Sequence, residues 1–345
     1  MMDVLIAGFG VVGQGITEVI RDKQDLFMKR FGERVRIVGA FDTRSMALDP
    51  SGLDPTELLS RKLATGQVGK VPVATDIEEL LRETAYDMLL EVTPTNIVDG
   101  EPGYTHIRTA LSAGRHVVTS NKGPLALRFR ELTELAARNR VQLRFEASVG
   151  GAMPVINLSR DLLMGEEITS IRGILNGTCN FILHRMKVEG YSFDFALREA
   201  QELGYAETDP SYDIDGVDSA CKLAILANAI FERDVTYSDV VRTGIRGINE
   251  EAISLAAEQN KVIRLIGEVS RDKLEVAPRL VPAGHQLSIG GTLNIAQILT
   301  DMAGDVTVVG RGAGRMETAS ALLSDILAIF KDEEVRRNAN RRAII

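Results

Sequence analysis

Asp3-Val-Leu-Ile-Ala-Gly-Phe-Gly-Val-Val-Gly13 is a short apolar run followed directly by three glycines with GxGxxG spacing, and helical spacing of apolar residues continues over residues 16–31. The pattern predicts a strand, a glycine turn and a helix, the context in which GxGxxG is informative. The first two glycines then let the backbone turn and approach a pyrophosphate, and the third permits close helix packing. The N–H groups at the helix start favour an anion. The predicted dinucleotide site consists of Gly8, Phe9, Gly10, Val11, Val12 and Gly13.

The second predicted strand, residues 35–41, ends at Asp42. In a dinucleotide fold an acid at this place binds the ribose hydroxyls of the adenosine half. Asp42 lies further along the chain than the usual spacing of about 20 residues, because the first helix is long, and a simple turn aspartate is the alternative. Arg44 is suited to a 2′-phosphate, so the sequence leaves NAD and NADP both open.

Strands and helices continue to alternate along the first half of the chain. A strand over residues 86–92 precedes Thr93, a helix is expected near residues 105–113, and a strand over residues 116–119 precedes Ser120 and Lys122. This alternation predicts a parallel, doubly wound sheet. Loops at the carboxyl ends of such strands line the cofactor crevice, so Thr93, Ser120 and Lys122 are predicted near the nicotinamide. For Lys122 the alternative is a solvent-facing helix cap.

The second half predicts a different kind of domain. Glycines and small residues over 147–154 mark a crossover and a plausible hinge, and two apolar runs, residues 262–269 and 274–280, favour antiparallel strands. The predicted fold class is therefore α/β, with a Rossmann-like doubly wound parallel sheet and a second α+β domain built on an open mixed sheet, whose outer face is a candidate oligomer interface. The expected divisions are residues 1–146, residues 147–305, and a segment 306–345 that returns to the nucleotide domain with Gly310 and Gly312 near the dinucleotide.

The segment 203–222 carries five acidic side chains ahead of Lys222. An EF-hand alignment with Gly216 at the sixth position puts Lys222 where a bidentate glutamate is required, which argues against a calcium loop. Asp218 and Lys222 stand four residues apart on one helix face. An ordinary surface ion pair is the alternative, but the apolar run after Lys222 predicts burial, which favours a site for a substrate ammonium and a proton-transfer lysine.

Composition limits the classes of partner. A chain of 345 residues with 45% hydrophobic content is long enough for two cores. A formal charge of −8 argues against nucleic acid or an anionic membrane as the main partner. No apolar stretch of about 18 residues and no export signal is present, so a cytoplasmic protein is expected. The two cysteines, Cys179 and Cys221, lack zinc-ligand spacing and are predicted to be buried.

Several separated motifs occur in one order along the chain: GFGVVG at Gly8, SNKGPLA at Ser120, EASVGGAMPVI at Glu146, LNGTCNFIL at Leu175, LGYAETDPSYDIDGVDSACK at Leu203 and GRGAG at Gly310. In these motifs the sequence resembles homoserine dehydrogenase over nearly its whole length. The resemblance implies NAD(P)-dependent interconversion of L-homoserine and L-aspartate 4-semialdehyde, a step of threonine and methionine biosynthesis. It also implies a homodimer formed through the second domain.

The resemblance carries roles onto individual residues. By motif position, Lys222 would be the general acid/base at the substrate hydroxyl, and Asp218 would hold that lysine and the substrate. Glu207 and Asp213 would receive the ammonium of the amino acid, and Thr178 would lie beside the substrate.

A lysine that acts as a base near pH 7 needs its pKa lowered by burial or by a nearby cation. Lys122 is a candidate for that cation and for polarising the aldehyde oxygen. The acids around Lys222 act in the opposite direction, and the sequence leaves the balance between these effects open.

The resemblance further implies a monovalent cation, sodium or potassium, held by main-chain carbonyls of Glu146, Val149, Gly151 and Met153. Oxygen-only ligation suits such an ion better than a transition metal. The alternative is a glycine-rich crossover without an ion. A short chain of this kind is also expected to lack an ACT regulatory domain and an aspartokinase domain.

Three other interpretations of the sequence compete with homoserine dehydrogenase. The segment around His116 resembles the glucose-fructose oxidoreductase family, but Asn121 and Gly123 depart from its pattern. Aspartate semialdehyde dehydrogenase needs an activated cysteine, and neither cysteine lies in a convincing electropositive turn. A non-catalytic dinucleotide sensor is the third alternative, and it has no need of the Asp218–Lys222 pair.

Overall fold

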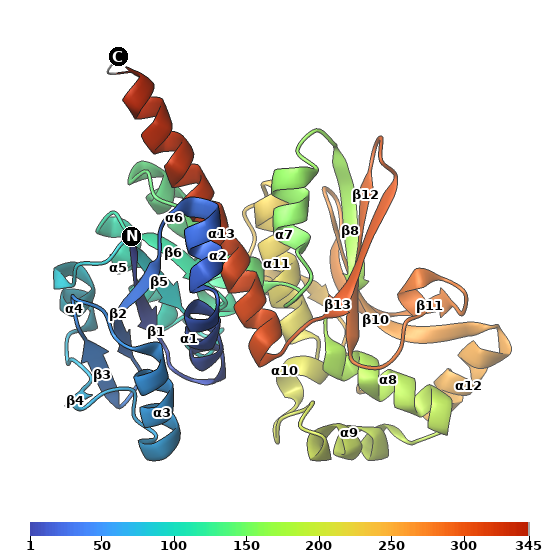
Figure 1. The fold of residues 1–345 in the computed structure, drawn as a ribbon. Helices are drawn as coiled ribbons and strands as arrows, with labels where there is room; N and C mark the ends of the chain where they lie inside the picture. Colours follow the sequence, from blue (N-terminus) through green and yellow to red (C-terminus); the bar gives the residue numbers. More distant parts are fainter. Residues whose placement is uncertain (344–345) are drawn as a thin grey trace. The chain divides into compact units, whose positions relative to one another are not determined.

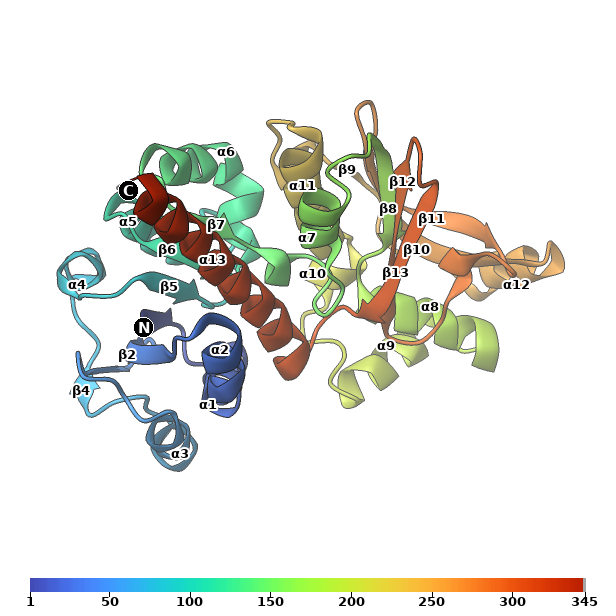
Figure 2. The ribbon, with the colours of Figure 1, turned by 45° about the horizontal axis from the view of Figure 1, so that its top comes forward.

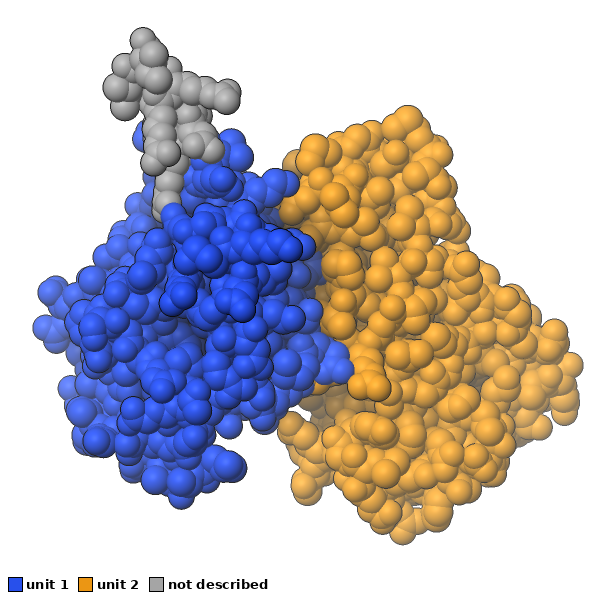
Figure 3. All heavy atoms as spheres, in the orientation of Figure 1, with its two compact units in different colours: residues 1–148, 315–345 blue, residues 149–314 orange. Residues whose placement is uncertain are grey.

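The computed structural model describes residues 1–343, with side chains described to residue 335. The chain divides into two compact units, which Figure 3 colours separately. The first comprises Met1–Ser148 together with the chain from Arg315 onward, and the second comprises Val149–Gly314. The chain therefore leaves the first unit close to the crossover predicted at residue 147, and each unit is described by itself below.

The first unit is built on a seven-stranded sheet. Its strand order is β4 (Val71–Pro72), β3 (Ser45–Leu48), β2 (Val35–Phe41), β1 (Met2–Ala7), β5 (Met88–Glu91), β6 (His116–Thr119) and β7 (Leu143–Arg144). The five strands from β2 to β7 are parallel, which confirms the predicted doubly wound sheet. The antiparallel edge strands β3 and β4 were not predicted.

Helices cover both faces of this sheet (Figure 1). They are α1 (Val11–Asp22), α2 (Gln24–Phe31), α3 (Pro55–Thr65), α4 (Ile77–Glu83), α5 (Gly103–Ser112), α6 (Lys122–Arg138), η1 (Glu146–Ser148) and α13 (Arg315–Ala343). The single helix expected over residues 16–31 is interrupted at Lys23, whose backbone is not helical.

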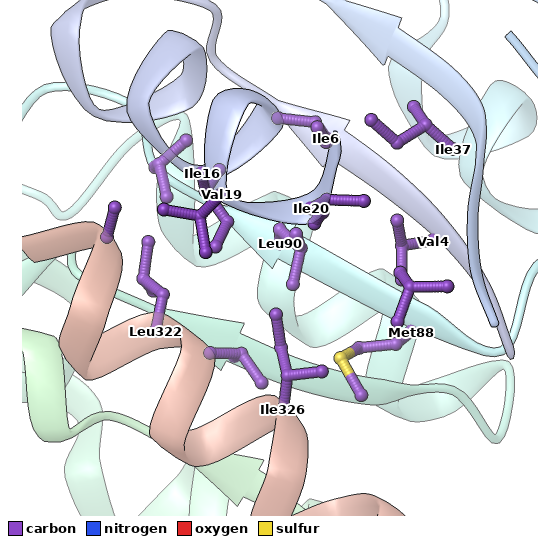
Figure 4. Close-up of a cluster of buried hydrophobic side chains, with 14 of the residues drawn as sticks. Val4, Ile6, Ile16, Val19, Ile20, Ile37, Met88, Leu90, Leu322 and Ile326 are labelled. Carbon is purple, nitrogen blue, oxygen red and sulfur yellow. The ribbon is translucent and has the colours of Figure 1, made fainter. Parts of the chain in front are cut away.

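Helix α13 returns from the end of the second unit and packs beside α1 and α2 (Figure 2). Figure 4 shows Leu322 and Ile326 of α13 in one apolar cluster with side chains of α1 and of the sheet. Gly15 permits this packing, because a Cβ there would lie only 2.9 Å from the backbone oxygen of Arg315. The last helix thus completes the core that supports β1 and the glycine turn.

The second unit contains a six-stranded mixed sheet. Its order is β13 (Asp305–Arg311), β12 (Leu293–Thr300), β8 (Ile168–Ile174), β10 (Lys261–Ser270), β11 (Leu274–Pro282) and β9 (Val241–Arg242). The predicted antiparallel pairing of the strands around residues 262–269 and 274–280 is confirmed by β10 and β11. Strand β12 was not predicted, and its apolar run provides the partner for β13.

Because β13 pairs with β12, the segment after residue 305 does not act as one body. The strand Asp305–Arg311 belongs to the second sheet, and only the chain from Arg315 belongs to the first unit. The structure therefore differs from the expectation that residues 306–345 return together to the nucleotide domain.

The helical segments of the second unit are α7 (Val155–Asn157), η2 (Leu158–Leu162), α8 (Gly177–Glu189), α9 (Phe193–Glu202), α10 (Ser211–Ile214), α11 (Val217–Phe231), η3 (Tyr237–Asp239), α12 (Glu250–Glu258) and η4 (Gln286–Ser288). Helices α8, α11 and α12 pack on β10. A Cβ at Gly267 of β10 would lie 3.1 Å from the side chain of Leu223, so this glycine lets α11 approach the sheet. None of the helices in the described part of the chain is long and apolar enough to cross a membrane.

Candidate active site

The glycine turn after β1 has the geometry that the sequence predicts. Gly8 has a φ of +97°, and a Cβ there would lie 2.8 Å from the carbonyl carbon of Val92. A Cβ at Gly13 would lie 2.2 Å from the oxygen of Gly8, whereas a Cβ at Gly10 would meet nothing within 4 Å. Gly8 and Gly13 therefore serve the turn itself, and Gly10 borders open space at the start of α1, where helix N–H groups favour an anion. This arrangement fits a dinucleotide pyrophosphate.

Asp42 follows β2 but its carboxylate is already engaged. Oδ1 accepts hydrogen bonds from the backbone N–H groups of Arg44 at 2.8 Å and Ser45 at 2.9 Å, and Oδ2 lies 2.7 Å from Lys62 Nζ. Burial alone raises the pKa of Asp42, but the hydrogen bonds from Lys62 and from the two backbone groups outweigh it and hold the pKa below its usual value.

Lys62 was missed by the sequence reasoning. It lies on α3, and nothing in its local sequence indicates that the helix brings it to the end of β2. The ion pair places a cation beside Asp42, the acid that was expected to bind the ribose hydroxyls of the adenosine half.

The predicted residues at the ends of β5 and β6 are brought together. Asn121 Nδ2 donates to Thr93 Oγ1 at 3.1 Å, and the backbone N–H of Ser120 donates to the oxygen of Glu91. Asn121 caps α6, and Lys122 is the first residue of that helix. Since a cation at a helix N-terminus is opposed by the helix dipole, helix stability does not explain the lysine at this position.

In the second unit, Lys222 and Asp218 form a buried ion pair, with 8% and 7% of their side chains exposed. Lys222 Nζ lies 2.6 Å from Asp218 Oδ2 and 2.5 Å from the oxygen of Leu175. The alternative of an ordinary surface ion pair is therefore wrong. Eleven consecutive residues of α11, Asp218 to Asn228, are buried, because the helix packs on β10 and β11.

Asn176 connects this pair to a second acid, Asp213. Its Nδ2 donates to Asp213 Oδ1 at 2.7 Å and to Asp218 Oδ2 at 2.9 Å, while its Oδ1 caps α8 by accepting from the N–H of Cys179. Asn176 stands in the LNGTCNFIL motif, and no role was predicted for it from the sequence. Asn176 lies one residue before the observed α8, and asparagine is a common N-cap.

Glu207 and Thr178 lie at the edge of this cluster. Glu207 is exposed in the loop after α9, where Gln201 binds its backbone oxygen. Thr178 Oγ1 donates to the oxygen of Tyr205 at 2.7 Å, which ties the same loop to α8. The structure thus groups Asp213, Asp218 and Lys222 directly and connects Glu207 and Thr178 through the backbone of the loop.

Two cysteines lie beside this cluster, and the thiol of Cys179 is not an activated nucleophile. Both Cys179 and Cys221 are buried, and neither forms a disulfide. Burial, together with the nearby carboxylates of Asp213 and Asp218, raises the pKa of the Cys179 thiol well above its usual value. A thiol kept protonated in this way is a poor nucleophile, which argues against a cysteine-dependent semialdehyde dehydrogenase.

The residues predicted for a cation and for the second glycine turn are divided between the units. Glu146 lies in the first unit, where Asp325 accepts its N–H, and Val149, Gly151 and Met153 lie in the second. Gly310 and Gly312 pack against other parts of the second unit: a Cβ at Gly310 would lie 2.9 Å from Met153, and one at Gly312 would lie 1.9 Å from Asn294 Nδ2. In the described part of the chain no cluster of His, Cys, Asp and Glu side chains suits a metal.

Comparison with known proteins agrees with this geometry. Residues 8–146 match the family model of the homoserine dehydrogenase NAD-binding domain, and residues 154–327 match the homoserine dehydrogenase model. The chain belongs to the homoserine dehydrogenase family. Homoserine dehydrogenase from Methanocaldococcus jannaschii is 47% identical over 95% of this chain and 98% of its own length. An NAD(+)-dependent homoserine dehydrogenase from Pseudomonas canavaninivorans is 39% identical over 94% and 95%.

Solved homoserine dehydrogenases have the same fold. A putative homoserine dehydrogenase from Archaeoglobus fulgidus has a TM-score of 0.89 at 47% identity, covering 96% of this chain and 99% of that one. A hyperthermophilic archaeal homoserine dehydrogenase in complex with NADPH has a TM-score of 0.84 at 30% identity, covering 96% and 98%. Family membership makes this protein an NAD(P)-dependent oxidoreductase acting on a CH–OH group, and it excludes the three competing readings.

Proposed function

We propose that the protein interconverts L-homoserine and L-aspartate 4-semialdehyde, with Lys222 as the proton-transfer group at the substrate oxygen. The buried Lys222–Asp218 pair is the observation that carries this proposal. Burying a lysine in an apolar helix costs desolvation free energy, and a purely structural ion pair could lie at the surface without that cost. Family membership supports the substrate, and the reaction belongs to the synthesis of threonine and methionine.

In the oxidative direction, the glycine turn of the first unit would hold NAD(P)⁺, which when bound would supply the acceptor for the hydride from C4 of homoserine. Lys222, with its amine neutral, takes the hydroxyl proton as the carbonyl forms. Asp218 and the oxygen of Leu175 hold Lys222 Nζ, so the lysine reacts from one fixed position. In the reductive direction the ammonium of Lys222 returns that proton to the oxygen that receives negative charge.

We propose that Asp213 and Glu207 receive the substrate ammonium, with Thr178 beside it. Asn176 supports this arrangement, because one amide group sets the distance between Asp213, which faces the amino end of the substrate, and Asp218, which holds the lysine. The exposed side chain of Glu207 is able to turn toward a cation in the same loop region. A substrate without an α-amino group would lose this binding energy.

We propose that the Asp42–Lys62 pair contacts the adenosine ribose of both NAD and NADP. Asp42 suits the two hydroxyls of an unmodified ribose, and Lys62 with Arg44 suits a 2′-phosphate. Because Lys62 neutralises Asp42, the acid repels a phosphate less than an isolated carboxylate would. We therefore propose that both dinucleotides are accepted.

The rest of the dinucleotide is proposed to lie along three groups of residues. The pyrophosphate would be held by Gly8, Phe9, Gly10, Val11, Val12 and Gly13. The nicotinamide end would lie at Thr93, Ser120 and Lys122, and Gly310 and Gly312 would also be near the dinucleotide.

A homodimer is proposed through the sheet of the second unit. The register places Arg172, Gln297 and Thr307 on the face opposite the packed helices, with apolar Val309 next to them and 49% exposed. A second copy is the proposed occupant of this face.

We also propose a bound sodium or potassium ion, held by the main-chain carbonyls of Glu146, Val149, Gly151 and Met153. A cytoplasmic location is proposed as well. Both proposals are supported by the family resemblance.

The proposal is tested by adding L-homoserine with NAD⁺ or NADP⁺ separately at alkaline pH and following the absorbance of the reduced nicotinamide. Turnover specific to homoserine, with L-threonine and an unrelated polyol as inactive controls, is the expected result. Dinucleotide binding without homoserine-dependent reduction would contradict it and would require another substrate.

A further inference from the structure

Glu91 is a completely buried acid at the carboxyl end of β5, within the first unit. Its Oε1 accepts from the backbone N–H of Thr93 at 3.1 Å and also from the Thr93 hydroxyl. Its Oε2 accepts from Thr119 Oγ1 at 3.1 Å, at the end of β6. One carboxylate therefore ties together the ends of two neighbouring parallel strands.

The connection continues from these strands into both following loops. Thr119 Oγ1 accepts from the N–H of Asn121 at 3.0 Å, and Asn121 Nδ2 returns to Thr93 Oγ1 at 3.1 Å. The four residues form a closed ring of hydrogen bonds, Glu91 to Thr93 to Asn121 to Thr119 and back, in which the backbone N–H of Asn121 makes the contact with Thr119. Lys122 follows directly, and its position depends on Asn121 because that residue caps α6.

A third strand end approaches the same acid. His106 of α5 is 4% exposed and has Nδ1 3.7 Å from Glu91 Oε1, and no hydrogen bond satisfies that nitrogen in the described part of the chain. The imidazole packs edge-on against Phe41, the last residue of β2, with ring centroids 5.4 Å apart. The buried acid thus contacts Thr93 just after β5 and Thr119 at the end of β6, and it is connected through His106 to the end of β2.

Burial of a carboxylate is expensive unless hydrogen bonds offset the loss of water. A leucine at residue 91 would fill a similar volume without that cost, so packing alone does not account for an acid here. All the groups that Glu91 binds lie at the carboxyl edge of the parallel strands, where a dinucleotide fold binds its ligand. Tyr86 lies just before the other end of β5 and differs from Glu91, because its buried hydroxyl makes no hydrogen bond in the described part of the chain.

We propose that Glu91 is a positioning residue for the nicotinamide half of the dinucleotide. It acts through Thr93 and Asn121 by fixing the two loops that present Thr93, Ser120 and Lys122. The inference rests on the proposed function, which assigns these loops to the nicotinamide. Glu91 itself touches neither cofactor nor substrate.

The test measures binding of the reduced dinucleotide by nicotinamide fluorescence, and binding of ADP-ribose, which lacks the nicotinamide, by calorimetry. In Glu91→Leu we expect dinucleotide affinity to fall about tenfold or more, the size of losing a hydrogen bond to a charged group. ADP-ribose affinity and the KM for L-homoserine should stay close to those of the unchanged protein. Glu91→Gln should recover most of the dinucleotide affinity, because Oε1 still accepts from Thr93.

Two further variants keep the test decisive. Tyr86→Phe changes a buried residue close to the same strand and should leave every binding constant unchanged. Thr119→Val is nearly isosteric and keeps Glu91 in the protein. It should show the same selective loss of dinucleotide affinity, and it replaces Glu91→Leu as the test if that variant does not fold.

Equal loss of ADP-ribose and dinucleotide affinity, or unchanged dinucleotide affinity in both Glu91→Leu and Thr119→Val, would overturn the positioning role. Failure of the unchanged protein to oxidise homoserine would instead overturn the proposed function, because the binding measurements do not depend on turnover.

Discussion

Lys222 Nζ lies 2.6 Å from Asp218 Oδ2, with both side chains less than one tenth exposed. Two opposite charges one helical turn apart are usually a weak surface contact worth about 0.3–0.5 kcal/mol. Here they are out of water, and each has a further hydrogen-bond partner, Asn176 for Asp218 and the oxygen of Leu175 for Lys222. The pair therefore fixes the position of one amine, which is what proton transfer to a single substrate oxygen needs.

Asn176→Ala should raise the KM for homoserine, in addition to the loss of stability that follows from removing an N-cap. The variant loses an N-cap, which costs about 1 kcal/mol, and it also releases Asp213 and Asp218 from their shared donor. Asn249→Ala, which removes the N-cap of α12 instead, is the matched control. Steady-state kinetics and thermal unfolding of both variants check this, and equal KM values in the two would show that Asn176 is only a cap.

Gly10→Ala should separate binding from folding. Gly10 has a φ of −78° and open space around its Cβ position, so alanine fits the protein itself. The added methyl group would occupy space next to the pyrophosphate, and dinucleotide affinity should fall with little change in Tm. Gly13→Ala should instead lower Tm, because its Cβ would overlap the oxygen of Gly8. A Gly10→Ala protein that binds dinucleotide normally would contradict the placement of the pyrophosphate.

Lys62→Met should weaken NADP binding more than NAD binding. The change removes a cation suited to a 2′-phosphate and leaves the Asp42 carboxylate without its ion-pair partner. Loss of one charge-assisted hydrogen bond is worth about 1.5–3 kcal/mol, or roughly tenfold to a hundredfold in affinity. The ratio of kcat/KM for the two dinucleotides measures the effect, with Lys70→Met, an exposed lysine, as control. An unchanged ratio would remove Lys62 from the ribose site.

His184 should make the protein less stable in acid. Burial, together with the neighbouring Arg264 and Arg185, lowers the pKa of His184. The unfolded chain then binds the proton more readily, so stability falls as the pH drops from about 6.5 toward the lower pKa of the folded state. Other facing charges are Lys187 and Glu189. His184→Gln should reduce the loss of Tm between pH 7 and pH 5, and an unchanged pH dependence would contradict this.

The features that were predictable from sequence are those whose residues lie close together in the chain. The strand, glycine turn and helix at Gly8–Gly13 depend on about a dozen consecutive residues, and Asp218 and Lys222 are joined by the helical period alone. The strand pairing of β10 and β11 likewise follows from one short connection.

The features that were missed depend on distant packing. Strand β12 is a short apolar run whose identity depends on its partners β8 and β13. Lys62 meets Asp42 only because α3 folds beside β2, and Glu91 is recognisable only once Thr119 lies next to it. These contacts join residues 20 and 28 positions apart, which no local pattern records.

The most direct test of the central claim is the turnover of Lys222→Met, measured together with its dinucleotide affinity. Methionine fills the space without carrying a proton, so kcat for homoserine oxidation should fall at least about a hundredfold, the contribution expected of a positioned acid/base. Nicotinamide fluorescence should show unchanged binding of the reduced dinucleotide. Turnover of Lys222→Met within a few-fold of the unchanged protein would contradict the assignment of proton transfer to Lys222.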